Sequence, residues 1–350
     1  MSDELAARDP SKHVRACFWL VVATLIWGTS FPLVKAVWLV QEKLVPNPPD
    51  FFLAALAAVA RFGLAGFLIA LFSMRTLRQL TRSEVHQGLG LGVFGGLGIL
   101  FQMDGLAHTA ASTSAFLTQF TCVFIPLWVA LRRRALPGPF IIAATLLVLW
   151  GMAILTGFKF SELKLGRGEA ETILSALFFA GQILWLERPR YAANRVANFT
   201  VVMFATIAVL IAPIALFTAP TLRAIVTAYS SGHVLLLVGA LALACTLAAY
   251  SLMNYWQPHV SATEAGLIYC VEPLFTSVFA AFLPGWLSAF AGINYANEKF
   301  TRALLIGGGL ITLANVLIQL EAWRQRRKVA TARWGETPSN PNSSAARRTE

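Results

Sequence analysis

Five charged residues interrupt the long apolar runs of this sequence, and they are the first candidates for chemistry. They are Lys35, Arg61, Asp104, Glu264 and Glu272. A charge at the centre of a bilayer costs about 2.5–3.5 kcal/mol on insertion scales, so each needs a partner or a task. Two of the five are positive and three are negative, so they can nearly balance one another. Such a set supports ion pairing, substrate binding or proton transfer.

Glu272 is the strongest candidate for carrying a proton. It directly precedes Pro273 in the middle of an apolar run. Because proline removes a backbone donor, we expect the helix to bend where the acid lies. A carboxyl group that is buried away from water favours its neutral form, which would let Glu272 carry a proton near neutral pH. The alternative is a structural role, as the partner of Arg61 or of another helix.

The other charged candidates each have more than one interpretation. Asp104 and His108 are spaced i,i+4 on one helix face, which fits proton exchange or a structural hydrogen bond at the helix end. Lys35 either reaches the outer interface or lines the outer half of a cavity. Arg61 lies ten residues into its run and fits an ion pair, the capping of carbonyls or substrate contact. Glu264, near the cytoplasmic end of its run, can reach water.

Three aromatic residues, Trp27, Phe31 and Tyr269, are candidates to line a cavity for flat or apolar metabolites. Many aromatic side chains in such runs instead face lipid or the membrane interface. The four cysteines all lie in apolar runs, and the sequence has no CxxC or Cys/His spacing. We therefore predict buried free thiols, no metal site and no cofactor.

The elements that must position these residues are apolar runs of about 20 residues, the length of a helix that crosses a bilayer. Of the 350 residues, 57% are hydrophobic and only 13% are charged, which excludes an ordinary soluble enzyme. The runs are continuously apolar rather than alternating, so we expect an all-α membrane protein and not a barrel. The ten predicted transmembrane helices are 16–39, 51–72, 87–107, 112–131, 139–158, 170–187, 198–217, 233–255, 261–283 and 303–321.

The basic residues predict the orientation of the chain. Of the 28 Lys and Arg residues, 19 lie in segments on one side and seven on the other, so the positive-inside rule places the N- and C-termini in the cytoplasm. We thus predict a multi-pass protein of a cell membrane, in a bacterium the inner membrane. The basic residues behind the net charge of +11 then lie at the surface of the lipid bilayer, so this charge does not indicate binding to nucleic acid. Residues 1–15 form the cytoplasmic N-terminus, and 322–350 are predicted to be a disordered basic tail.

Two spacings indicate an internal duplication. The Gly28–Lys35 pair recurs as Gly181–Arg188 at an offset of 153, and a proline recurs at an offset of 147. A five-helix unit repeated in tandem must invert, which is the plan of many secondary transporters, with substrate bound between the halves. Chance matching of small residues is the alternative. The predicted units are a first repeat over 16–158, an external connector over 159–169 and a second repeat over 170–321.

Four stretches carry a family resemblance. WGTSFPLVKA (27–36), VARFGLAGFLIA (59–70), GLAHTAASTSAFLT (105–118) and ATEAGLIYCVEPLFTSVFA (262–280) resemble motifs of the drug/metabolite transporter superfamily, in its ten-helix EamA-like family. The resemblance covers about residues 15–321 and implies ten helices and a transport activity. Two features depart from the family pattern. Three arginines replace the acidic turn usual after the fourth helix, and the loop over 284–301 is long.

The sequence therefore predicts a secondary active transporter and not an enzyme. It would export small metabolites or amphipathic compounds by alternating access, driven by protons or by a counter-substrate. A membrane-embedded enzyme is the alternative, although the sequence has no HExxH, paired intramembrane aspartates or phosphate loop. A lipid-handling or scaffold protein is a further alternative. The small-molecule substrate and the oligomeric state are not predicted, since a glycine stripe over 88–96 fits internal packing or a dimer.

Overall fold

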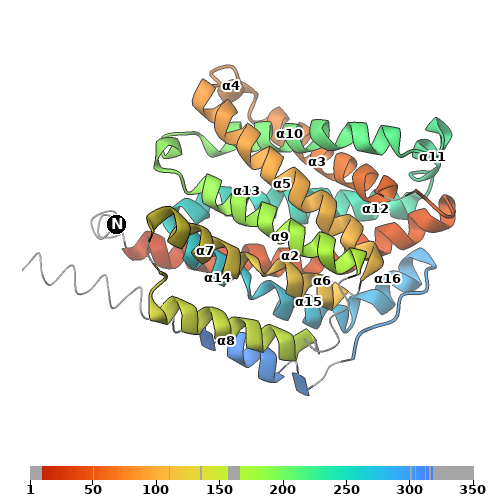
Figure 1. Cartoon of the computed structure of the whole chain (residues 1–350). Helices are drawn as coiled ribbons and strands as arrows, with labels where there is room; N and C mark the ends of the chain where they lie inside the picture. The colour runs from red at the N-terminus through yellow and green to blue at the C-terminus, as the bar shows by residue number, and fades with distance from the viewer. Residues whose placement is uncertain are drawn as a thin grey trace, which may run out of the picture.

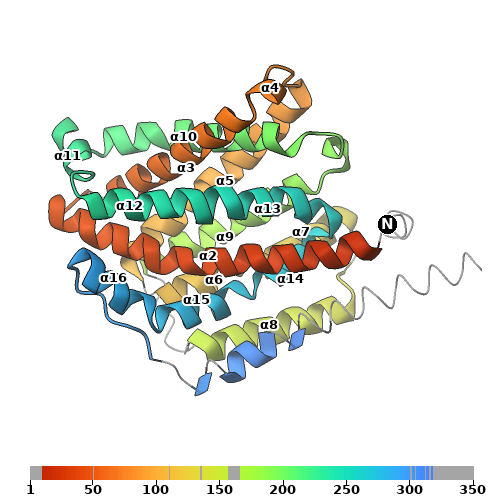
Figure 2. The ribbon, with the colours of Figure 1, turned by 180° about the vertical axis from the view of Figure 1, so that it is seen from behind.

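The computed structural model describes residues 10–49, 51–109, 111–134, 136–156, 166–299, 302–303, 305–311, 313–314 and 317. The expected all-α class is confirmed over these residues, which contain helices and connections and no strand. Figures 1 and 2 show the long helices running side by side along one common direction. The end of the bundle where α2 begins is called the Pro10 end here, and the opposite end is called the Leu44 end.

The long helices are formed by the apolar runs. Five are continuous: α2 (Pro10–Leu44), α3 (Phe52–Phe72), α5 (Arg82–His108), α9 (Arg167–Leu186) and α10 (Val196–Phe217). Others are assembled from shorter pieces: α6 (Ala111–Thr118) with α7 (Thr121–Arg133), α12 (Gly232–Ala240) with the π-helical η3 (Leu241–Ala248) and α13 (Ala249–Trp256), and α14 (Ala262–Tyr269) with α15 (Glu272–Ala280). The rest are α4 (Met74–Leu77), α8 (Pro139–Thr156), η2 (Pro189–Tyr191), α11 (Leu222–Thr227), η4 (Gln257–His259) and α16 (Leu283–Ala291).

Seven of these helical stretches are long and apolar enough to cross a membrane, or eight if α14–α15 and the bent α16 form one span. A further apolar helix, Pro139–Ile154, is shorter. The tenth predicted span, 303–321, is described only at 303, 305–311, 313–314 and 317, and residues 1–9 and 318–350 lie outside the described residues. The chain is thus a multi-pass membrane protein, and the count of ten helices stays a prediction.

The loop predicted over 284–301 is wrong in its first part. Leu283–Ala291 form helix α16, bent by 54° from the preceding helix. Pro284 lies in the first turn of α16. N–H groups in the first turn have no acceptor within the helix, so the missing N–H of proline costs no hydrogen bond there. Gly292 ends the helix with a φ of 63°, a left-handed conformation that favours glycine.

The glycine stripe of α5 is used inside the fold. A Cβ on Gly88 would lie 2.5 Å from Cβ of Val202, and one on Gly92 would overlap the side chain of Thr206. Both partners belong to α10, which runs beside α5 and α3 (Figure 1). The small residues let these backbones approach closely, so internal packing accounts for the stripe.

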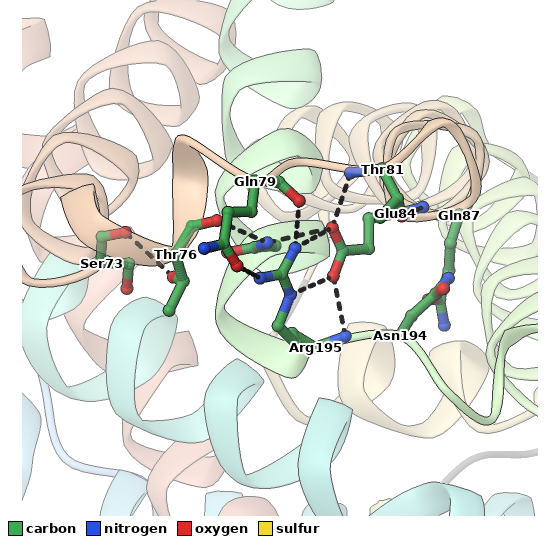
Figure 3. A network of polar contacts seen from close by, with 9 residues as sticks. Ser73, Thr76, Gln79, Thr81, Glu84, Gln87, Asn194 and Arg195 are labelled. Carbon is green, nitrogen blue, oxygen red and sulfur yellow. Dashed lines mark hydrogen bonds and ion pairs between the residues drawn. The ribbon is translucent and has the colours of Figure 1, made fainter.

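A polar network ties the start of α10 to the connection between α3 and α5 at the Pro10 end (Figure 3). The buried carboxylate of Glu84 accepts hydrogen bonds from Nε of Arg195 at 2.8 Å and from Nδ2 of Asn198 at 3.0 Å. It also accepts the backbone N–H of Thr81 at 2.9 Å, which completes the N-terminal capping box of α5. The guanidinium of Arg195 reaches on to the carbonyl of Gln79. These bonds fix α3, α5 and α10 relative to one another.

The four cysteines are free thiols, as predicted. Cys122, Cys245 and Cys270 are buried, and Cys17 is half-buried with its sulfur 3.9 Å from Nδ1 of His13.

Candidate functional site

A cavity of about 70 Å³ lies near the middle of the bundle. It is bounded by α2, α3, α5, α9 and α13 and by the two interrupted helices, α6–α7 and α14–α15. Its lining combines aromatic, amide and charged side chains. The lining residues are Trp27, Ser30, Arg61, Ile99, Gln102, Thr118, Gln119, Thr121, Phe179, Ile183, Tyr250, Met253, Tyr269 and Glu272.

Glu272 lies at a two-residue interruption of its helix, whereas the 54° bend comes after Ala280 rather than at Pro273 as expected. Helix α14 ends at Tyr269 and α15 begins at Glu272. Glu272 is 8% exposed, and its carboxyl group accepts a hydrogen bond from Nε2 of Gln119 at 2.7 Å. Gln119 itself lies in the break between α6 and α7. The site therefore joins two interrupted helices through one buried carboxyl–amide pair.

Arg61 lines the same cavity and is 3% exposed. Its Nε donates to Oγ1 of Thr246, and its Nη2 donates to the carbonyl of Cys245 at 3.0 Å. Among the described residues no carboxylate lies within ion-pair distance of Arg61, and its Nη1 has no hydrogen-bond partner. The guanidinium thus caps a backbone carbonyl, which was one of its predicted roles. Its unpartnered nitrogen remains available for a ligand.

The π-helical segment η3 holds Arg61 in place. The carbonyl of Cys245 accepts both from Arg61 and from Nε1 of Trp27, the latter at 3.1 Å. The hydroxyl of Thr246 donates to the carbonyl of Leu241 at 3.0 Å, which turns its lone pairs towards the arginine. Single π-helical turns inside α-helices are frequent at functional sites. In this structure, Trp27 of α2 and Arg61 of α3 both bond to the same carbonyl of η3, that of Cys245.

Aromatic rings form one wall of the cavity. Trp27 contacts Tyr250 and Tyr269 edge to face, with ring centroids 5.3 and 5.6 Å apart. The hydroxyl of Tyr269 donates to Oε1 of Gln257 at 2.9 Å. Trp27 and Tyr269 therefore both line the cavity. Phe31 is buried in the surrounding core and is not among the lining residues.

Asp104 and His108 lie at the Leu44 end, away from the cavity. Their side chains are 3.7 Å apart, in the i,i+4 relationship predicted. The stronger partner of Asp104 is Arg167, whose Nη2 lies 2.5 Å from Oδ2, and Oδ1 accepts the backbone N–H of Phe51 at 2.8 Å. Arg167 also pairs with Glu171 at 2.8 Å. This arrangement connects the starts of α3 and α9 to the end of α5.

Lys35 and Glu264 also lie outside the cavity and hold helix ends. The Lys35 ammonium donates to the carbonyls of Leu106 and Ala107 at 3.2 and 3.3 Å, so it neutralises the last turn of α5. Glu264 completes a capping box with Ser261 at the start of α14 and lies 3.3 Å from Nε2 of His13. It is 7% exposed, so it is buried among partners and does not reach water as expected.

Of the six charged and titratable candidates, the structure brings Arg61 and Glu272 together at one cavity. The neutral polar residues that bond to these two charges, Gln119 to Glu272 and Thr246 to Arg61, were not predicted. They could have been found because a buried amide or hydroxyl, like a buried charge, costs free energy unless it has a hydrogen-bond partner. No group of three or more His, Cys, Asp and Glu side chains within the described ranges is placed to hold a metal ion.

Known proteins resemble this chain in sequence and in fold. Residues 14–157 match the EamA-like transporter family. A protein of Archaeoglobus fulgidus that is named an uncharacterized transporter is 25% identical over 312 residues, which are 88% of this chain and 87% of that protein. A crystal structure with 19% sequence identity and a TM-score of 0.63 covers 89% of this chain and 99% of its own, so the two share a fold. The resemblance to the drug/metabolite transporter superfamily is thereby confirmed, and it indicates a transporter.

Proposed function

We propose that this relative of the EamA-like transporters is a secondary active transporter that exports small metabolites or amphipathic compounds across the cell membrane. It works by alternating access, with coupling to protons or to a counter-substrate. The observation that carries the proposal is the central cavity, where Arg61 and Glu272 are both buried and Glu272 lies at the junction of two interrupted helices. Interrupted helices that meet at mid-depth are a common construction of substrate sites in transporters.

The pattern of helix contacts supports two inverted repeats. Helix α5 packs on α9, and in the proposed second repeat the α12–η3–α13 unit packs on α2 in the same way. Helices α6 and α7 contact α9, while α14 and α15 contact α2. If α2 is the counterpart of α9, and α5, α6 and α7 are the counterparts of helices in the second half, then each contact in one half has an equivalent contact in the other half. The breaks at Gln119 and Cys270 are 151 residues apart, between the two offsets that the sequence shows.

The two interrupted helices also run antiparallel, as an inverted repeat requires. Helix α6, the first part of one, contacts α15, the second part of the other, and α7 contacts α14. The cavity lies between these pairs, near the centre of the proposed pseudo-symmetry. A ligand bound there would touch both repeats at once, which is what alternating access needs.

The lining favours an amphipathic substrate. Trp27, Tyr250 and Tyr269 offer aromatic surface to a flat apolar portion. The free nitrogen of Arg61 can bind an anionic or carbonyl group, and Glu272 can hold either a proton or a cationic group. A cationic substrate and a proton would then compete for the carboxyl group of Glu272. For other substrates, the affinity would depend on whether that group is protonated.

The moving parts in this proposal differ from the two halves of the sequence. A rocking of the first five helices against the last five would follow the division into repeats, but α5 packs closely on α9, and α3 and α5 pack closely on α10, across that division. The Glu84–Arg195 ion pair reinforces the same group. We therefore take α3, α5, α9 and α10 as one body, with α2, α13 and α15 moving against it.

Transport in proteoliposomes tests the proposal. A thermal-shift screen of amino acids, nucleosides and cationic dyes first finds a compound that stabilises the purified protein. Its flux is then measured with and without a pH gradient for wild type, Glu272→Gln and the control Glu298→Gln, whose acid lies outside the cavity. The gradient is expected to accelerate flux in wild type and in the control but not in Glu272→Gln. Undiminished pH-driven flux in Glu272→Gln would remove Glu272 as the coupling group.

Asp104 was the second coupling candidate, and the same assay ranks it. Because Arg167 holds Asp104 away from the cavity, Asp104→Asn is expected to lower stability while leaving the response to the gradient in place. If Asp104→Asn loses the response to the gradient and Glu272→Gln keeps it, the coupling group is Asp104 at the Leu44 end and not Glu272.

A further inference from the structure

A cluster of basic and aromatic side chains lies at the Pro10 end, apart from the central cavity. We call it the Trp185 cluster, and it comprises His86, Trp185, Arg188, Arg190 and Tyr191. The guanidinium carbon of Arg188 lies 3.8 Å from the centre of the Trp185 ring, and that of Arg190 lies 5.5 Å from it. The His86 ring stacks on the same indole, with ring centres 5.4 Å apart at an interplanar angle of 28°.

Hydrogen bonds order the exposed side of the cluster. Nη2 of Arg190 donates to the hydroxyl of Tyr191 at 2.5 Å and lies 3.3 Å from Nδ1 of His86. The same hydroxyl lies 2.5 Å from Nδ1 of His86. Tyr191 is buried, whereas Arg190 and His86 are exposed. The arrangement therefore presents ordered nitrogen donors at the surface, above an indole floor.

The cluster has positive charge without a matching carboxylate. Burial lowers the pKa of Arg188, and the nearby charges of Arg190 and Arg132 lower it further. Within the described part of the chain, none of these three arginines forms an ion pair. Arg167 and Arg195, by contrast, each have a carboxylate within 2.8 Å. Adjacent guanidinium groups repel one another, so the Trp185 cluster lacks an anion that would stabilise it.

We propose that the Trp185 cluster binds the phosphodiester headgroup of an anionic membrane phospholipid. The planar guanidinium of arginine matches phosphate oxygens with paired N–H donors, and stacking on Trp185 holds Arg188 in a fixed orientation. The cluster lies where the membrane helix α9 ends and where His86 of the first turns of α5 stacks on Trp185, at the depth where tryptophan and headgroups meet. The Pro10 end is predicted to face the cytoplasm, and basic pockets between helices on that side bind anionic headgroups.

Native mass spectrometry of the full chain in a non-ionic detergent tests the proposal. The probes are phosphatidylglycerol, phosphatidylcholine with the same acyl chains, and inorganic phosphate as a competitor. The test variant is Arg188→Gln with Arg190→Gln. The matched control is Arg75→Gln with Arg78→Gln, which removes two arginines from α4 and its C-terminal end, on the same side of the bundle. Thermal unfolding without added lipid establishes that each variant is folded.

Phosphatidylglycerol is expected to bind wild type more tightly than phosphatidylcholine. At roughly 1 kcal/mol for each basic residue near a membrane surface, the test variant should bind it about thirtyfold more weakly and the control nearly as wild type. Equal binding of the two lipids, or equal losses in the test and control variants, would overturn the proposal. Displacement of the lipid by inorganic phosphate would show a site for free phosphate instead.

Arg188→Lys keeps the proposal testable if the double variant does not fold. Lysine retains the positive charge but cannot stack flat on the indole or offer paired donors. Weaker binding of phosphatidylglycerol by Arg188→Lys is expected if the stacked guanidinium holds the phosphate. Unchanged binding by this variant would contradict that assignment.

Discussion

Gln119 donates its side-chain amide to the carboxyl group of Glu272 at 2.7 Å, and this bond crosses between two helices at the points where each is interrupted. Both side chains are buried, so neither group can exchange this partner for bulk water in the same conformation. Movement of one break relative to the other would change what Glu272 contacts. The bond therefore relates the geometry of the cavity to the state of its acid.

The first prediction concerns Gln119. In Gln119→Leu, the buried carboxyl group loses its hydrogen-bond donor, so the free energy of unfolding should fall by about 1–3 kcal/mol. Thermal unfolding in detergent measures the loss, and pH-driven flux should weaken in parallel. Gln102→Leu is the matched control, because Gln102 lines the same cavity but bonds the hydroxyl of Thr118 at 3.1 Å. Equal effects of the two substitutions would contradict a special role for the bond to Glu272.

The second prediction concerns Thr246, which positions Arg61. Thr246→Val keeps the shape of the side chain and removes the oxygen that accepts from Nε. Since hydrogen bonds to charged groups contribute about 1.5–3 kcal/mol, substrate affinity should fall about tenfold or more. Thr246→Ser retains the hydroxyl and should stay close to wild type. Titration of the stabilising compound into each variant checks this, and equal affinities in the valine and serine variants would argue against the assignment.

The third prediction concerns the packing of α5 on α10. A Cβ at Gly92 would overlap Thr206 and lie 2.9 Å from the carbonyl of Met203, so Gly92→Ala should destabilise the fold by about 1–3 kcal/mol. At Gly63 in α3, a Cβ would have no neighbouring atom within 4 Å, and there the better helix propensity of alanine should stabilise by about 1 kcal/mol. Melting temperatures of the two variants should therefore move in opposite directions.

The fourth prediction concerns Glu298, after α16. Burial raises the pKa of Glu298 above its ordinary value of 4.5. The folded state then binds a proton that the unfolded state has released, so this group stabilises the fold most below its unfolded pKa, and that stabilisation is lost as pH rises through the folded pKa. Melting temperature measured from acidic to neutral pH should decline less in Glu298→Gln than in wild type. An identical slope would show that Glu298 titrates normally.

The sequence predicted the class of fold and the two charges of the cavity for one physical reason. Arg61 and Glu272 are too costly to leave unpartnered in an apolar run, whatever the tertiary structure. Neutral residues such as Gln119 and Thr246 carry a weaker signal, because threonine can bond to its own helix and an amide can pair almost anywhere. Spacing within one helix predicted the Asp104–His108 pair. It could not predict Arg167, which approaches Asp104 from another helix.

The π-helical segment had no detectable sequence signal, because LALACTLA reads as an ordinary apolar helix. Helix α16 did have one, since Pro284 and Gly292 mark a helix start and a helix end. The family resemblance, by contrast, led to the prediction of a long loop over 284–301. Local capping signals were more informative there than the family pattern.

The burial of the thiols makes the native chain a practical background for site-specific labelling. Reagents attack exposed thiolates, and three of the four cysteines are buried while Cys17 is only partly accessible. Arg78→Cys and Arg223→Cys would place single reactive thiols at the end of α4 and on α11, at opposite ends of the bundle. Once the partly accessible Cys17 has been replaced, a fluorophore or spin label at either position would report the opening of that end during turnover, with the three buried cysteines left in place.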